Sequence, residues 1–255
     1  MSKTFEIIDI NTDNLEKEGF FCYMSKRKAP GYQQKRDWLE ERFGEGLKLK
    51  IIHEIGGRKT GFIEYVPGEY AWRAVHAPDY IFIHCLWVVG KGKGKGYAAQ
   101  LIQTCLEDAR AQGKLGVVMV ASDRVWLVGK EIFLHHGFEM VDESVPFQLL
   151  VKRFKNGPNP SFPVNWEERQ AAFGPGLTVL RTPQCPYIED AVNGCAEVAG
   201  ELGIPFKTIE FLTAAEVQER APSPFGIFSI VKDGKLLSYY YLLPKDLRKR
   251  LTENS

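Results

Sequence analysis

Residues 80–109 read YIFIHCLWVVGKGKGKGYAAQLIQTCLEDA, and this stretch decides how the first half of the chain folds. Residues 80–89 form a long β-rich run, which predicts a strand. Residues 90–96 then alternate glycine with lysine. From Ala98 to Ala109 apolar residues recur at steps of three and four, which predicts a helix with one apolar face that ends near Gly113. The order is strand, glycine loop and helix.

The loop from Gly90 to Gly96 has the composition of an anion site. Glycine has no Cβ, so the backbone can turn its N–H groups inward as a nest. The start of the following helix adds a partial positive charge, and Lys91, Lys93 and Lys95 add counter-charge at the rim. The loop therefore suits a pyrophosphate, and a flexible basic turn without a ligand is the alternative.

Two other glycine motifs fit this loop poorly. A Walker loop requires GxxxxGK[ST], whereas Lys95 is followed by Gly96 and not by a hydroxyl residue for magnesium. A dinucleotide fingerprint requires GxGxxG and an acidic residue about 20 positions later. Here the glycines alternate, and no acidic residue stands there at the end of a second strand.

Two domains are predicted from the length and from one change in composition. The 255 residues exceed the roughly 100 to 150 residues common for a single core. Residues 155–176 hold four prolines and three glycines, which interrupt any helix or strand pattern. We predict a first domain over 1–154, a linker over 155–176 that packs through Trp166 and Phe173, and a second domain over 177–255.

Hydrophobic periodicity and turn residues predict an α/β fold. In the first domain the expected strands are 5–10, 47–54, 60–66, 80–89, 117–120, 138–141 and 147–154, and the expected helices are 33–43, the helix after the loop and 129–136. In the second domain the expected strands are 177–181, 206–211, 227–231 and 236–242, and the expected helices are 188–202, 214–220 and one from Lys245. Asp233 and Gly234 predict a hairpin turn.

Charge and cysteine usage exclude several classes of protein. Thirty-three basic against 32 acidic residues give a net charge of +1, so no global field favours nucleic acid or an anionic membrane. The N-terminal residues include acidic side chains where a secretory peptide would have an uninterrupted apolar segment. No apolar run is long enough to span a membrane. Five scattered cysteines without CxxC pairs indicate reduced thiols and no structural metal. We predict a cytoplasmic protein that binds no metal.

Residues 91–98, KGKGKGYA, resemble the [RQ]xxGxGxA segment of the GCN5-related N-acetyltransferases (GNAT), with Lys91 at the usual arginine or glutamine position. The strands on either side of the loop and His136-Gly137-Phe138 fit the order of that family, so the resemblance covers roughly residues 4–154. It implies a GNAT-type mixed sheet with flanking helices. It also implies acetyl-CoA as co-substrate and direct attack of an acceptor amine on the thioester.

The resemblance also implies which residues contact the coenzyme. The pyrophosphate is expected on the loop amides and the pantetheine arm along the end of the strand before it. The implied coenzyme-binding residues are Leu86, Trp87, Val88, Lys91, Gly92, Lys93, Gly94, Lys95, Gly96, Tyr97 and Ala98.

The chain departs from the family pattern at the acceptor site. Phe133 stands where the family often has a tyrosine that protonates the leaving thiolate, Trp126 where asparagine is common, and Gly129 where alanine is usual. Phenylalanine donates no proton, so the general acid is missing, replaced or unnecessary.

His84 is the candidate general base, because its pKa near 6.5 suits proton removal near neutrality. A satisfied core histidine is the alternative. Strand alternation predicts that Cys85 faces away from His84. His135 and His136 are expected to cap a helix C-terminus, and Asp79, Ser122 and Asp123 are strand-end groups that could bind an amine.

Thr182-Pro-Gln-Cys185-Pro-Tyr-Ile188 lies between a strand and a helix. A cysteine just before a helix N-terminus gains thiolate character, so Cys185 is the second candidate catalytic residue. The segment resembles a glutaredoxin active site, and the predicted βαβαββα order is similar to the thioredoxin fold, but Ile188 replaces the second cysteine. Cys195 lies ten residues on, about 15 Å along a helix, too far to resolve Cys185.

The two halves together resemble the YoaP family of bacterial N-acetyltransferases. The main hypothesis is an acyl-CoA-dependent N-acyltransferase that acts on a small-molecule or peptide amine. The alternative is a monothiol redox or thiol-ligand protein that uses Cys185, with a non-catalytic CoA-binding domain. A third hypothesis is a non-catalytic CoA-binding interaction protein. The sequence identifies neither the acceptor nor the oligomeric state.

Overall fold

The computed structural model describes residues 5–124 and 127–253, and the chain divides into two compact units. The first unit consists of 1–25, 36–71 and 75–162. The second unit consists of 163–255 together with two short segments, 26–35 and 72–74. Each unit has its own sheet.

The first unit is built on a seven-stranded sheet in the order β1-β2-β3-β4-β5-β7-β6. Neighbouring strands are antiparallel except for β4 and β5, which are parallel. The sheet is therefore mixed, as predicted, and the α/β class is confirmed. Its strands are β1 (Phe5–Ile10), β2 (Lys48–Glu54), β3 (Lys59–Pro67), β4 (Tyr80–Val88), β5 (Gly116–Ala121), β6 (Glu139–Ser144) and β7 (Phe147–Arg153).

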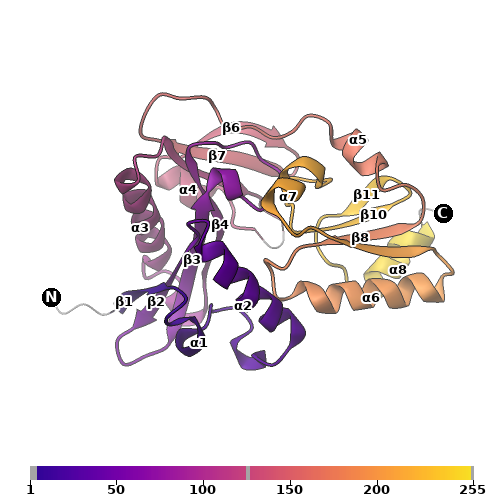
Figure 1. Ribbon diagram of the computed structural model, residues 1–255, viewed down its shortest axis with the longest axis horizontal. Helices are drawn as coiled ribbons and strands as arrows, with labels where there is room; N and C mark the ends of the chain where they lie inside the picture. The colour runs from indigo at the N-terminus through magenta and orange to yellow at the C-terminus, as the bar shows by residue number, and fades with distance from the viewer. Residues whose placement is uncertain (1–4, 125–126, 254–255) are drawn as a thin grey trace. The chain divides into compact units, whose positions relative to one another are not determined.

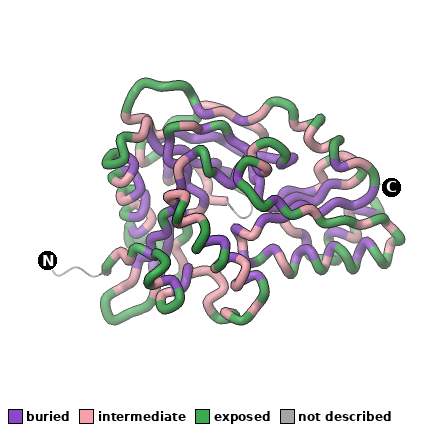
Figure 2. The backbone as a smooth tube through the Cα atoms, in the orientation of Figure 1, coloured by how far each residue is buried: buried purple, intermediate pink, exposed green. Residues whose placement is uncertain are grey.

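Helix α3 (Tyr97–Ala111), labelled in Figure 1, contributes one apolar face to the core of this unit. Leu101, Ile102 and Cys105 are fully buried in a cluster with residues from β2, β3, β4, β5 and β7. Figure 2 shows purple, buried stretches in the interior and green, exposed stretches at the periphery. The other helical elements before residue 163 are α1 (Leu15–Glu18), η1 (Met24–Lys26), α2 (Pro30–Phe43), η2 (Gly68–Tyr70), η3 (Gly90–Gly92) and α4 (Glu131–His135), and residues 26–35 of these count with the second unit.

The second unit contains a four-stranded sheet in the order β11-β10-β8-β9. Strands β8 and β9 are parallel, whereas β10 is antiparallel to both β8 and β11. Its elements are α5 (Trp166–Ala171), β8 (Leu177–Arg181), α6 (Ile188–Glu201), β9 (Phe206–Glu210), α7 (Ala214–Arg220), β10 (Phe228–Lys232), β11 (Lys235–Ser238) and α8 (Pro244–Glu253). The predicted strand and helix order from 177 onward is confirmed. Asp233 and Gly234 both have positive φ, as the predicted hairpin turn requires.

The predicted domain boundaries differ from the observed units. Residues 163–176, which were predicted as part of a linker, contain α5 and count with the second unit. Phe173 is buried, and the side-chain amide of Gln170 donates to Pro222 O and accepts from Leu236 N. These hydrogen bonds attach α5 to the second unit. The segment therefore packs on that unit despite its prolines.

Among the described residues, no helix combines the length and the apolar character needed to cross a membrane. Within the same residues, no group of three His, Cys, Asp or Glu side chains could hold a metal ion.

Candidate functional site

The two parallel strands of the first sheet separate where the candidate site lies. Four of the nine residues of β4, from Tyr80 to Ile83, pair with Gly116 to Met119 of β5. The remaining five residues of β4 have no ladder partner on β5 within the described chain. Parallel strands that stop pairing leave backbone N–H and C=O groups for another partner. This stretch includes Leu86, Trp87 and Val88.

A β-bulge interrupts β4 at the candidate base. Glu64 of β3 pairs with Cys85 and Tyr65 pairs with Ile83, so His84 is the extra residue. Ile83 and Leu86 both lie in the α3-side core cluster, which strict alternation would not allow. The prediction that His84 and Cys85 face opposite sides of the sheet assumed regular alternation along β4. The bulge breaks that alternation at His84, so that assumption is wrong.

The glycine loop takes backbone conformations that L side chains rarely adopt. Gly90, Gly94 and Gly96 have φ of 55°, 78° and 77°, a region in which a Cβ is unfavourable. A Cβ at any of these three positions would meet nothing within 4 Å. Backbone strain, and not crowding, therefore selects glycine at these positions, and the backbone stays accessible from outside.

Gly92 is selected by close packing instead. A Cβ there would lie 3.1 Å from Cβ of Thr60 and 3.2 Å from Cγ1 of Val88. Thr60 is 3% exposed, and its hydroxyl has no hydrogen-bond partner among the described residues. A buried hydroxyl without a hydrogen-bond partner is costly. The Thr60 hydroxyl, against which Gly92 packs, is therefore available to donate a hydrogen bond.

The first turn of α3 points its free amides at this loop. The first helical hydrogen bond runs from Gln100 N–H to Gly96 O at 3.1 Å. The N–H groups of Tyr97, Ala98 and Ala99 precede it and have no acceptor inside the helix. Free N–H groups of this kind and the dipole of the helix favour an anion.

The lysines of the loop are less uniform than the sequence suggested. Lys95 Nζ lies 2.7 Å from Glu54 Oε1, which also accepts from Tyr97 OH at 2.8 Å. The Lys95 and Tyr97 hydrogen bonds hold the pKa of Glu54 below its usual value. Lys93 is exposed, and the side chain of Lys91 lies outside the described atoms. Lys95 therefore has a carboxylate partner of its own.

His84 is a buried, paired residue. It is 1% exposed, and its Nδ1 lies 3.2 Å from Oε1 of Glu64, which is 2% exposed. Its ring also packs near Trp38 of α2 and Phe82 of β4, with centroids 6.1 and 5.8 Å away. The pair lies on β3 and β4 just beyond the end of the β4–β5 ladder. Sequence reasoning missed Glu64, although a lone acid within the apolar run 60–66 signals a buried partner.

Other predicted groups distribute unevenly around the site. Phe133 is fully buried in the core cluster beside Phe138, so it is a packing residue. Ser122 and Asp123 follow β5 at the same edge as the loop, whereas Asp79 precedes β4 at the opposite edge. Asp79 therefore lies at the end of β4 away from the glycine loop. Gly129 lies against Asp123, and Trp126 lies outside the described residues.

The two histidines of α4 cap its last turn, as predicted. Nδ1 of His135 lies 2.7 Å from Glu131 O, and Nδ1 of His136 lies 2.7 Å from Ile132 O. Histidines near a helix C-terminus commonly bond its last carbonyls.

In the second unit, the Cys185 loop is tightly packed. The buried Arg73 donates to Gln184 Oε1 at 2.7 Å and to Trp72 O at 2.8 Å. A Cβ at Gly31 would lie only 2.2 Å from Pro186 O, so backbone meets backbone there. Cys185 itself is half-buried.

Cys195 lies deep in this unit. It is 1% exposed, and burial raises the pKa of its thiol to about 12. A thiol of such pKa stays protonated and is a poor nucleophile near neutrality. This supports the expectation that Cys195 does not resolve Cys185.

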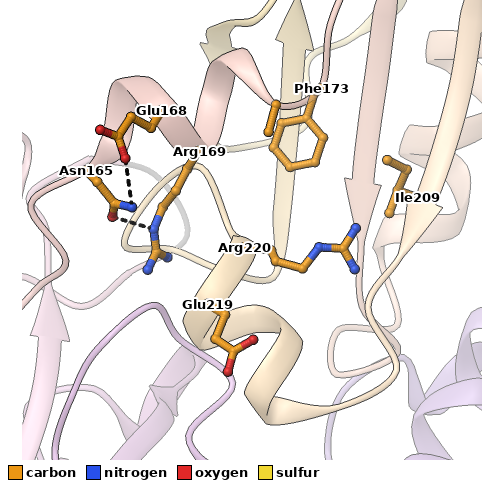
Figure 3. Close-up of a pocket in the computed structure, with 8 residues that line it drawn as sticks. Asn165, Glu168, Arg169, Phe173, Ile209, Glu219 and Arg220 are labelled. Atoms are coloured by element: carbon orange, nitrogen blue, oxygen red, sulfur yellow. Dashed lines mark hydrogen bonds between the residues drawn. The ribbon is translucent and has the colours of Figure 1, made fainter.

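A cavity of about 260 Å³ lies between α5, α7 and β9 (Figure 3). Arg169 reaches across it, donating to Asn165 Oδ1 at 2.9 Å and to Gln218 O at 2.8 Å. Arg220 bonds Glu216 at 3.1 Å. The guanidinium groups are therefore used to attach α5 and to brace α7, and the cavity is a crevice between these helices.

A family model described as "Acetyltransferase (GNAT) family" matches residues 12–125. The "Uncharacterized N-acetyltransferase YoaP" of Bacillus subtilis (strain 168) is 32% identical over 237 residues, 91% of this chain and 92% of that protein. That match extends through both units, because the first unit ends at residue 162.

Solved structures are similar at lower identity. A GNAT family N-acetyltransferase (YhbS) from Escherichia coli in complex with CoA is 15% identical with a TM-score of 0.42, covering 63% of this chain and 90% of that one. An N-acetyltransferase from Staphylococcus aureus Mu50 is 17% identical with a TM-score of 0.43, covering 60% and 100%.

Proposed function

The chain belongs to the GNAT family of acetyltransferases, and from this premise we propose that it transfers an acetyl group from acetyl-CoA to the amine of an acceptor. The observation that carries the proposal is the loop Gly90–Gly96. Three of its glycines have positive φ, and it leads into the free amides of α3 at the end of β4.

Acetyl-CoA is held by the loop and by the end of β4. The pyrophosphate binds the amides of Gly94 and Gly96 and the first turn of α3. The pantetheine arm follows Leu86 to Val88, where β4 no longer pairs with β5. An amide-bearing arm would occupy unpaired strand groups there.

The thioester supplies an activated acyl group, and the acceptor amine attacks it directly in a ternary complex. The new C–N bond forms as the C–S bond breaks, and the amine proton leaves to a base. His84, held by Glu64, is the base that we propose. Phe133 donates no proton, so the CoA thiolate leaves without protonation from α4.

The second unit is proposed as a thioredoxin-like scaffold. Its β8-α6-β9-α7-β10-β11-α8 order and its sheet order support this assignment. Cys185 is packed by Gln184 and Pro186, which contact Arg73 and Gly31. These contacts favour a structural use of the loop over thiol exchange.

Isothermal titration of acetyl-CoA into the wild type and into Gly94→Asp tests the proposal. An aspartate at φ 78° strains the loop and adds negative charge beside the pyrophosphate. We expect at least about tenfold weaker binding, which is about 1.4 kcal/mol. The matched control is Gly203→Asp, since Gly203 also has positive φ with nothing within 4 Å of a Cβ but lies in the second unit.

Absence of acetyl-CoA binding to the wild type would contradict the proposed function. Equal weakening of acetyl-CoA binding by Gly94→Asp and Gly203→Asp would show that the loss does not come from the glycine loop. Cys185→Ser, assayed for CoA release on an amine panel, is expected to keep activity; its loss would favour the thiol alternative.

A further inference from the structure

Three aromatic side chains meet on the face of β3 and β4 that is turned away from α3. Phe62 and Trp87 are direct cross-strand partners, so their side chains lie on one face. The ring of Phe21 packs on Phe62 with centroids 5.1 Å apart. Phe62 is buried, whereas Trp87 is 48% exposed. The exposed Trp87 side chain is therefore the cross-strand neighbour of a buried ring that packs on Phe21.

We propose that this aromatic face, defined by Phe21, Phe62 and Trp87, seats the acceptor, and that the acceptor is an amine carried on an aromatic body. The inference rests on the proposed acetyl transfer and names its substrate class.

The aromatic face lies at the same end of the sheet as the glycine loop. Val89 N–H, one residue before the loop, donates to Thr60 O at 2.9 Å, and Gly92 packs on the Thr60 side chain. Phe62 is two residues from Thr60 on β3, about 7 Å along a strand. An acceptor on Trp87 thus lies beside the part of β4 that receives the thioester.

The segment that carries Phe21 is fixed to this edge. Lys59 Nζ, at the start of β3, donates to Glu18 O at 2.6 Å and to Glu18 Oε2 at 2.7 Å. The Lys59 hydrogen bond lowers the pKa of Glu18. Because the Glu18 carboxylate is already paired with Lys59, it does not bind a further ammonium group. This segment therefore favours an acceptor with few charges over a polyamine.

Phe21 and Tyr23 hold φ of 77° and 58°. Non-glycine residues in this region are strained, and such strain concentrates at binding sites. Such strain persists only where the surrounding packing holds it, and here that packing includes the contact of the Phe21 ring with Phe62. A preformed aromatic surface is the result.

The polar group of the acceptor has a place as well. Glu64 lies two residues from Phe62 on the same face of β3, with His84 bonded to it. An aromatic face attracts a cationic ammonium, and the buried pair then receives its proton. The ring of the acceptor therefore lies on Trp87 while its nitrogen points along β3 and β4 toward His84.

The test compares three acceptors by CoA release: 2-phenylethylamine, its saturated analogue 2-cyclohexylethylamine, and spermidine. Only the phenyl compound can pair its ring with that of Trp87, so we expect its kcat/KM to exceed that for each of the others by about tenfold. Trp87→Leu should abolish this preference through the KM for the acceptor, and Trp87→Phe should retain it. Because the backbone of Trp87 also lies along the proposed pantetheine arm, the acetyl-CoA Kd is measured for each variant and rates are compared at saturating acetyl-CoA. Tyr70→Leu, at another exposed aromatic of the first unit, is the matched control.

A preference for spermidine, equal rates on the phenyl and cyclohexyl compounds, or a preference that survives Trp87→Leu would overturn the inference, as would turnover on none of the three. Acetyl-CoA binding measured in parallel separates the cases: if it persists, the proposed function stands and the acceptor class is wrong. If it is absent, both fail.

Discussion

The two units contain the same local arrangement, a strand followed by a loop, a helix and a parallel strand, yet the loops differ in character. In the first unit β4, the glycine loop, α3 and β5 follow one another, and in the second unit β8, the Cys185 loop, α6 and β9 do. The glycine loop leaves its backbone open, since a Cβ at Gly94 would touch nothing. The Cys185 loop is packed, with Gln184 buried against Arg73.

A helix N-terminus can accept a ligand only where its surroundings leave room. Both helices begin directly after such a loop, but the Ile188 N–H of α6 donates to Cys185 O. In the first unit strand pairing ends beside α3, whereas in the second unit segments 26–35 and 72–74 are part of the packing. A cysteine before a helix is consequently weaker evidence for chemistry than an open glycine loop.

The largest effect is expected from Gly31→Ala. The new methyl would lie 2.2 Å from Pro186 O, so backbone must move, and we expect a loss of about 3 kcal/mol in the free energy of unfolding. Gly200→Ala in α6, where a Cβ meets nothing, should be neutral or stabilising. Chemical denaturation of the full chain measures both, and equal stability of the two variants would mean that the Cys185 loop is not tightly packed.

The buried thiol of Cys195 predicts an alkaline loss of stability. Its folded pKa of about 12 lies above the value of about 8.5 in the unfolded chain. The contribution is complete below about pH 8.5 and falls by about 1.4 kcal/mol per pH unit between the two values. Cys195→Ala should have a shallower decline between pH 9 and 10.5, and an unchanged slope would contradict the assignment.

A coupling of about 1 kcal/mol is expected between Arg73 and Gln184, because each satisfies a buried polar group of the other. The double-mutant cycle Arg73→Met, Gln184→Met and their combination measures it by denaturation. Additive effects would show that the bond contributes nothing to the second unit.

The smallest effect sharpens the picture of the open loop. The pKa of Glu54 is lowered, so its pair with Lys95 persists at neutral pH and is lost only as the pH falls through that lowered value. Glu54→Gln releases the Lys95 charge, and we expect about threefold tighter acetyl-CoA binding that disappears in high salt. Glu107→Gln, an exposed carboxylate of α3 that bonds Gln103, is the control. Weaker binding in Glu54→Gln would instead mean that the pair shapes the loop.

Most elements followed from local sequence, and the exceptions have physical causes. Strand β8 and helix α7 have the predicted bounds, whereas α2 begins at Pro30, three residues before the predicted start. Proline is favoured in the first turn because its missing N–H is unneeded there. The short helices α1 and α5 were missed because a single turn or two carries little periodicity.

The residues of the candidate site also divide into those that local sequence predicts and those that only the structure brings together. Periodicity and glycine spacing suffice for the loop and α3, since both signals are local. Glu64, Thr60 and Phe21 entered only with the structure, because cross-strand register and the end of the β4–β5 ladder bring them together. The bulge at His84 also depends on register, and alternation along one strand cannot reveal it.

By itself the sequence determined a mixed α/β chain in two parts, a glycine loop before an amphipathic helix, and a resemblance to an acetyltransferase family. These follow from residue identity and spacing along one segment. The tertiary structure decided which strand–loop–helix stays open, which aromatic rings share a face, and that His84 is paired with Glu64. Those depend on contacts between residues far apart in the chain, which no local pattern encodes.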